Sequence, residues 1–146
     1  YINSLGLLDS LTIVVHALNV NDKDLQILRR SKAKVCVCPR SNQNLHGKLP
    51  DIEKMIKNGI QPALGTDSLA SCNSLDVFDE IGFVKKHYPN LDPDIIFSMG
   101  TINGARALGL EGLTGKLLKG YKTPILYKPL PLVNKKNLFE CITSNE

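Results

Sequence analysis

Short apolar runs alternate with longer amphipathic segments over the first 110 residues of the chain. Residues 11–17, 33–39 and 60–64 are the apolar runs, and their β-branched and small apolar residues are typical of short buried strands. We expect residues 11–17 to be buried on both faces. Between the runs, apolar residues recur every three or four positions, which predicts helices at residues 21–31, 50–58, 74–88 and 92–108. This order of strands and helices is typical of parallel βαβ units.

Capping residues support these boundaries. Asn21 and Ser74 are placed to cap the helices that follow them, and Asp92 precedes a proline at the first helical position. Gly59 is placed to end a helix, and Pro62 implies a strand end or a bulge because it cannot donate a ladder hydrogen bond. The helical residues expected to face the core are Leu25, Leu28, Ile52, Met55, Ile56, Leu75, Phe78 and Ile81. Residues 1–10 are predicted to be the tail of a helix and a turn, and residues 137–142 a terminal helix or strand.

The amino-acid composition limits which classes of binding partner are expected. The 146 residues are 42% hydrophobic and 22% charged, which suits one soluble domain with a core. The net charge of +4 is spread without a basic block, so no nucleic-acid partner is expected. No apolar run approaches the roughly 20 residues of a membrane span and no signal peptide is visible, so we expect no membrane partner. The four cysteines lack zinc-finger or disulfide-scaffold spacing, which favours reduced thiols and a cytoplasmic location.

Two strand ends carry side chains that can do chemistry. The third apolar run stops at Gly65, and Asp67 follows it as a candidate metal ligand or general base, because chemistry is placed at the carboxyl ends of parallel strands. Capping of the next helix is an equally supported alternative for Asp67. His16 ends the first run, although a lone histidine is more often structural. If the two strands lie close together, His16 and Asp67 could bind a divalent metal or move protons.

The segment after the second run is a weaker candidate. Residues 40–48 read as a polar loop in which Ser41 and Asn42 could contact a substrate, although both residue types are common in loops for conformational reasons. His46 in the same segment and His87 at a helix end are expected to be exposed. Neither a Gly-x-Ser-x-Gly elbow nor a Gly-x-x-x-x-Gly-Lys phosphate loop is present.

The ordered motifs resemble the amidohydrolase superfamily. They are His16 at a strand end, Cys38-Pro39-Arg40-Ser41-Asn42, Leu64-Gly65-Thr66-Asp67-Ser68, and Asn73-Ser74-Leu75-Asp76. Residues 99–110 are similar to the Thr-x-Asn-Gly-Ala-x-Ala-Leu-Gly helix of one branch of that superfamily. This branch contains chlorohydrolases and aminohydrolases such as methylthioadenosine/S-adenosylhomocysteine, guanine and aminodeoxyfutalosine deaminases and triazine hydrolases.

The resemblance implies an α/β fold that is part of a (β/α)8 TIM barrel. Residues 1–110 would be its three C-terminal β/α units, and residues 111–146 a tail leading to a small β-sandwich. Asp67 would bind zinc or iron(II) and take a proton from the attacking water, while His16 would polarise or protonate the leaving side of an amino-substituted heterocyclic substrate. The residues implied to line the substrate pocket are Ser41, Asn42, Ser68 and Ser71.

The chain also departs from the family pattern. It lacks the His-x-His pair and the additional strand-end histidine that supply most of the metal ligands, and it begins at Tyr1 rather than at a methionine. We therefore expect a fragment of a metal-dependent deaminase or chlorohydrolase that is inactive and metal-poor alone. It would form a homo-oligomer or pair with a missing N-terminal part. The alternative is a non-catalytic α/β domain that assembles through its open sheet edge.

Overall fold

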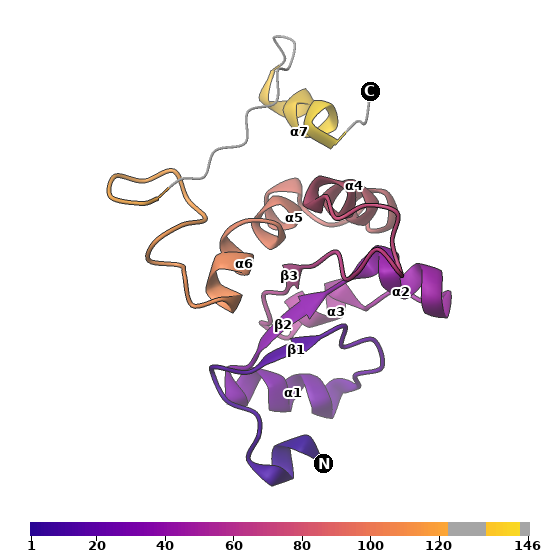
Figure 1. The fold of residues 1–146 in the computed structure, drawn as a ribbon, viewed down its shortest axis with the longest axis vertical. Coiled ribbons are helices and arrows are strands. Elements are labelled where there is room, and N and C mark those ends of the chain that lie inside the picture. The colour runs from indigo at the N-terminus through magenta and orange to yellow at the C-terminus, as the bar shows by residue number, and fades with distance from the viewer. Residues whose placement is uncertain (123–133, 144–146) are drawn as a thin grey trace.

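Three parallel strands form the centre of the molecule. The computed structural model describes residues 1–122 and 134–143. Strands β1 (Ile13–Val15), β2 (Lys34–Val37) and β3 (Ala63–Leu64) lie side by side in chain order, with Val14 opposite Val35 and Cys36 opposite Ala63 (Figure 1). All three strands therefore end at the same edge of the sheet. The predicted α/β class with parallel βαβ connections is confirmed for the described residues.

Helices pack around this sheet. In Figure 1, α1 lies on one side of the strands, and α4, α5 and α6 lie on the other. The helices and the initial 3-10 turn are η1 (Ile2–Leu5), α1 (Asp22–Ser31), α2 (Pro39–His46), α3 (Ile52–Lys57), α4 (Val77–His87), α5 (Pro93–Met99), α6 (Ile102–Ala107) and α7 (Lys135–Thr143). In the described part of the chain, no helix combines the length and apolar character needed to cross a membrane.

The core lies where β2 meets these helices. Val35 and Val37 of β2 are 2% and 0% exposed, and the predicted core residues Leu25, Met55 and Ile81 are almost fully buried beside them. The prediction that the first strand is buried on both faces is wrong in this structure. Among the described strands, β1 has one neighbour, so Ile13 and Val15 remain 38% and 50% exposed.

Several predicted helix ends are confirmed. The Asn21 side chain accepts hydrogen bonds from the backbone N–H groups of Lys23 and Asp24, and the Asp24 side chain accepts one from Asn21, forming a capping box. Asp92 caps α5, whose first residue is Pro93. Helix α3 ends at Lys57 with Asn58 as its C-cap, so the prediction that Gly59 caps it is wrong; Gly59 follows with φ 76°. Strand β3 begins just after Pro62, as the missing N–H group requires.

The start of α4 was predicted two residues too early. Asp76 caps it by accepting a hydrogen bond from the Phe78 N–H, whereas the Ser74 hydroxyl accepts one from the Asp76 N–H. The Ser74 prediction is therefore wrong. Because Leu75 lies outside the helix, its side chain is 55% exposed instead of facing the core.

Two segments differ more strongly from the sequence prediction. Residues 40–46 of the predicted loop are helical: Pro39 starts α2, whose buried Ser41 and Asn42 make tertiary hydrogen bonds that offset their weak helix propensity. The helix predicted over residues 92–108 is broken between Met99 and Ile102. Residues 1–10 contain only the 3-10 turn η1, which ends at Gly6.

The tail is described only in part. Residues 111–122 contain no helix or strand, and residues 137–142 belong to α7, which packs against α4. The proline-rich run 124–132 lies outside the described residues. The β-sandwich predicted for residues 111–146 therefore remains a prediction.

Candidate functional site

His16 and Asp67 are held at the carboxyl edge of the sheet by the last residues of β2. The His16 N–H donates to the Cys36 carbonyl at 2.8 Å, and the Gly65 N–H donates to the Val37 carbonyl at 2.9 Å. A Cβ on Gly65 would come within 2.8 Å of the Cys36 sulfur, so only glycine allows β3 to approach β2 this closely. The ladder thus places the residues that follow β1 and β3 on either side of the end of β2.

The backbone is unusual at the same two points. Only four described residues other than glycine have positive φ: His16 (69°), Ala17 (46°), Asp67 (61°) and Lys32. Lys32 ends α1, where a left-handed residue is ordinary. The other three lie together at the sheet edge, and such conformations persist at functional sites because the surrounding structure enforces them. His16 Nε2 and Asp67 Oδ2 are 4.0 Å apart.

Two hydroxyl groups surround the Asp67 carboxylate. Ser41 Oγ donates to Asp67 Oδ2 at 2.5 Å and Ser71 Oγ at 3.1 Å. These bonds, with Ser41 first, and the nearby His16 lower the pKa of Asp67 below its ordinary value. The carboxylate is therefore ionised at neutral pH. Its side chain is 31% exposed, so a small molecule or a cation can reach it.

Asn42 contacts the imidazole of His16. Its Nδ2 lies 3.3 Å from His16 Nδ1, whereas its Oδ1 is buried without a hydrogen-bond partner. The first turn of α2 thus reaches both strand ends, with Ser41 at Asp67 and Asn42 at His16. Sequence reasoning placed both residues near a substrate but in a loop, without these contacts.

A buried ion pair fixes this helical turn, and sequence reasoning missed it. Arg40 Nε donates to Glu80 Oε1 at 2.7 Å, and the Arg40 backbone N–H donates to Glu80 Oε2 at 3.3 Å. The same guanidinium donates to Asn73, Asp79 and the Ser74 carbonyl, which lie on the segment that follows the Asp67 loop. Arg40 belongs to the motif at residues 38–42, but its partner Glu80 lies 40 residues later in the chain. In the sequence, Glu80 looks like an acidic residue on the surface of a helix.

The remaining predicted residues lie at the margin of the site or outside it. Ser68 is exposed, and its carbonyl accepts hydrogen bonds from the backbone and hydroxyl of Ser71. The Ser71 carbonyl also accepts from Asn44 of α2 at 2.9 Å. His46 is exposed at the end of α2, and His87 is exposed on α4, as predicted.

The described residues do not form a complete zinc site. They contain no group of three or more His, Cys, Asp or Glu side chains able to hold one metal ion. His16 and Asp67 supply two donors, whereas a catalytic zinc takes about three protein ligands. The nearby Cys38 does not add a thiolate, because donation to Cys36 and burial raise the pKa of its thiol.

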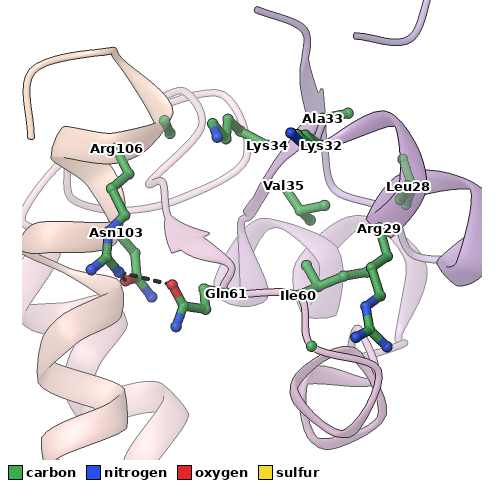
Figure 2. Close-up of a pocket in the computed structure, with 12 residues that line it drawn as sticks. Leu28, Arg29, Lys32, Ala33, Lys34, Val35, Ile60, Gln61, Asn103 and Arg106 are labelled. Carbon is green, nitrogen blue, oxygen red and sulfur yellow. Dashed lines mark hydrogen bonds between the residues drawn. The ribbon is translucent and has the colours of Figure 1, made fainter. Parts of the chain in front are cut away.

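A separate hollow of about 280 Å³ lies at the opposite, amino-terminal end of the strands (Figure 2). Lys34 and Ile60 line it, together with basic side chains from α1 and α6. Arg106 turns toward Gln61, to which it donates a hydrogen bond at 2.8 Å. The Arg29 guanidinium points away from Arg106 and Gln61. The basic groups do not converge on one point, and His16 and Asp67 are not among the lining residues.

Comparison with known proteins identifies the family of the chain. The model of the amidohydrolase family matches residues 1–129. The chain is 35% identical over 128 residues to a 5-methylthioadenosine/S-adenosylhomocysteine deaminase of Acetivibrio thermocellus, covering 83% of this chain and 30% of the relative. It is 36% identical over 120 residues to an aminodeoxyfutalosine deaminase of Deinococcus radiodurans, covering 82% and 28%. The chain thus spans about a third of the length of these curated relatives.

A solved structure agrees with this match. An adenosine deaminase from Xanthomonas campestris, solved with bound zinc, superimposes with a TM-score of 0.71 at 29% identity. The superposition covers 77% of this chain and 27% of that enzyme. The arrangement of strands and helices described above is therefore also found within a larger zinc-containing deaminase.

Proposed function

Since the chain belongs to the amidohydrolase family, we propose that it provides the proton-transfer groups of a metal-dependent aminohydrolase. The observation that carries this proposal is the carboxylate of Asp67. It follows a parallel strand in a left-handed conformation, is kept ionised by Ser41, and lies 4.0 Å from His16. The reaction class is hydrolysis of a C–N bond on an amino-substituted, purine-like ring, as the names of the relatives suggest.

In this reaction, the oxygen of water bonds to the ring carbon that carries the amino group. Asp67 takes a proton from that water, and the proton then passes to the departing nitrogen. The C–N bond breaks, ammonia leaves, and the ring carbon becomes a carbonyl. His16, whose Nε2 lies 4.0 Å from Asp67 Oδ2, would polarise the ring or protonate its leaving side.

The metal, zinc or iron(II), would activate the water. Asp67 is the ligand that this chain would contribute, and further donors must come from other residues, because the described part of the chain offers no group of three. We propose that residues 1–110 are three C-terminal β/α units of a (β/α)8 barrel, and that residues 111–146 lead to a small β-sandwich. The 146 residues alone would then be metal-poor and inactive.

The substrate would lie over the carboxyl edge of the sheet. Ser41, Asn42, Ser68 and Ser71 surround that edge, and Ser68 is the most exposed of them. Hydrolysis of a C–Cl bond would need the same groups to activate water. The residues at this edge of the sheet therefore do not distinguish a chlorohydrolase from a deaminase. We expect a reducing, cytoplasmic location, because Cys36, Cys38 and Cys72 are thiols that form no disulfide with another described residue.

The proposal is tested by ammonia release from adenosine-type nucleosides. We expect no release by the 146-residue chain with added zinc, and release by a longer protein that contains it. In that longer protein, Asp67→Asn should lower kcat by roughly 10²–10⁴-fold, the usual contribution of a general base, without changing the circular dichroism spectrum. Asp94→Asn on the surface of α5 is the matched control and should retain full activity. Full activity of the Asp67 variant would rule out the proposal.

A second candidate is a non-catalytic domain that assembles through its sheet edge. Exposed Ile13 and Val15 on β1 favour it, because apolar edge strands pair readily with other chains. Under this alternative, Asp67→Asn changes no activity, and the partner is a second copy of the chain or another strand-bearing chain.

A further inference from the structure

The side chain of Asn42 lies beside one of the two nitrogens of the His16 imidazole. Asn42 lies in the first turn of α2 and is only 2% exposed, so its amide is poorly accessible to a substrate. The amide instead faces His16 Nδ1 at 3.3 Å. The other ring nitrogen, Nε2, faces Asp67 Oδ2 at 4.0 Å. Each nitrogen of His16 therefore has a different polar neighbour.

These neighbours favour one neutral form of the ring. An amide Nδ2–H group can only donate, so the Nδ1 atom that faces it must accept, and the proton of the neutral ring lies on Nε2. Nδ1 is then a bare acceptor, and the Asn42 amide must turn its Nδ2–H group toward it. This is the orientation that the structure has. Asn42 with its amide reversed would instead place the proton on Nδ1 and leave Nε2 without a proton to donate.

This arrangement destabilises the fold at the side chain of Asn42. Its Oδ1 is buried without a partner, and a buried acceptor left unpaired costs about 1–3 kcal/mol. An apolar side chain of similar size would avoid that cost. The stabilising contribution of the amide therefore lies in its contact with His16, not in the packing of α2.

We propose that Asn42 is a positioning residue that holds His16 as the Nε2–H tautomer, with its proton directed toward the Asp67 side of the site. The proposal rests on the proposed function for its consequence: a neutral Nε2–H group can donate a hydrogen bond that polarises a bound ring. Helix α2 is suited to the task because the Arg40–Glu80 ion pair fixes its first turn. Ser41, between Arg40 and Asn42, holds Asp67 at the same time.

Nitrogen NMR of the 146-residue chain tests the tautomer without substrate or metal. The three histidines of the chain are labelled with ¹⁵N, and the spectra are recorded in mildly alkaline buffer to observe the neutral forms of the rings. His87 is an internal reference, because its Nδ1 lies 2.9 Å from the Phe83 carbonyl and must carry the proton. We expect His16 to show the opposite pattern, with a protonated Nε2 and a bare Nδ1. A protonated Nδ1 in the wild-type chain would overturn the proposal.

Substitution at residue 42 separates control by Asn42 from the intrinsic preference of imidazole. Asn42→Asp replaces the donor with an acceptor, so His16 should move its proton to Nδ1. Asn42→Ala removes both groups, and the spectrum should show a mixture of the two neutral forms. Gln43→Ala, at the exposed next position of α2, should leave the wild-type pattern. An unchanged tautomer in both Asn42 variants would overturn the proposal whether or not deamination is ever observed.

Discussion

At the scale of single residues, the site depends on groups that keep one carboxylate ionised and one imidazole oriented. Asp67 accepts from two hydroxyl groups, and the shorter contact is that of Ser41 at 2.5 Å. Hydrogen bonds to the charged form lower the pKa of an acid, so the shorter of the two hydrogen bonds should lower the pKa of Asp67 more. The pKa of Asp67 thus reports directly on the geometry of α2 at the sheet edge.

Ser41→Ala should raise the pKa of Asp67 toward its ordinary value of 3.8, and Ser71→Ala should raise it less. The carboxyl ¹³C shift of Asp67 measured against pH checks this order. Because the folded pKa of Asp67 is lowered, its stabilising contribution is present above the unfolded pKa and is lost as pH falls through the folded pKa. The stability gap between wild type and Ser41→Ala should therefore close in acid. Ser98→Ala, whose hydroxyl bonds only within α5, should not move the titration.

Sequence reasoning could place Asp67 and His16 at the carboxyl edge of the sheet because each lies at or just after the end of an apolar run. It could not find Arg40 and Glu80 as partners, because 40 residues separate them and their contact depends on how α2 meets α4. It also could not assign Ser41 to Asp67 or Asn42 to His16. Those contacts require that residues 39–46 be helical, and the intrinsic propensities of Ser and Asn favour a loop.

At the scale of elements, the Arg40–Glu80 pair joins α2 to α4. Glu80 is 0% exposed and the Arg40 side chain 11% exposed. Burial raises the pKa of Glu80, and the hydrogen bonds and charge of Arg40 act in the opposite direction. A buried pair of this kind contributes little relative to apolar packing, but loss of one partner leaves an uncompensated charge.

Arg40→Met should lower the free energy of unfolding by about 3–5 kcal/mol at pH 7, the usual cost of leaving one buried charge unpaired. Without Arg40, the pKa of Glu80 in the folded protein rises further above its value in the unfolded chain. The loss of stability therefore comes from the ionised form of Glu80. It should shrink as pH falls toward 4.5 and Glu80 becomes protonated. Urea denaturation at several pH values measures this. The double variant Arg40→Met/Glu80→Gln should recover most of the loss, and failure to recover would show that charge is not the cause.

The break between α5 and α6 also has a local cause. A Cβ on Gly100 would lie 2.8 Å from Ile81 Cδ1 of α4, so the chain packs tightly against α4 where the helix is interrupted. The apolar pattern of residues 92–108 continues through this point. Sequence periodicity therefore predicts one helix, and only the packing of α4 shows why there are two.

Gly100→Ala should destabilise the fold by about 1–3 kcal/mol, because overpacking forces Ile81 to move. Gly104→Ala is the matched control, since Gly104 lies within α6 with no atom within 4 Å of the added Cβ. It should instead stabilise the fold by about 0.5–1 kcal/mol through the lower entropy of the unfolded chain. Thermal unfolding of both variants gives the comparison. Equal effects would mean that the contact with Ile81 does not determine the break.

At the scale of the whole molecule, the sheet has an open apolar edge. β1 is bonded to β2 alone among the described strands, and Leu11, Ile13 and Val15 are 87%, 38% and 50% exposed. Both proposed functions assign this edge to contact with more protein, because an unpaired strand with apolar side chains pairs readily. At this edge, they differ in whether the partner completes a barrel or is a second copy of the chain or another strand-bearing chain.

The 146-residue chain should therefore self-associate as its concentration rises, because pairing at β1 removes apolar surface from water. Ile13→Lys/Val15→Lys places two charges on that edge and should shift the chain toward monomer, since like charges on paired edge strands repel. Sedimentation velocity at several concentrations measures the change, and circular dichroism confirms that the fold persists. Leu117→Lys is the control, because Leu117 is 82% exposed but lies outside the sheet, and it should leave association unchanged. A wild-type chain that stays monomeric at every concentration, or a control that dissociates equally, would remove β1 as the contact surface.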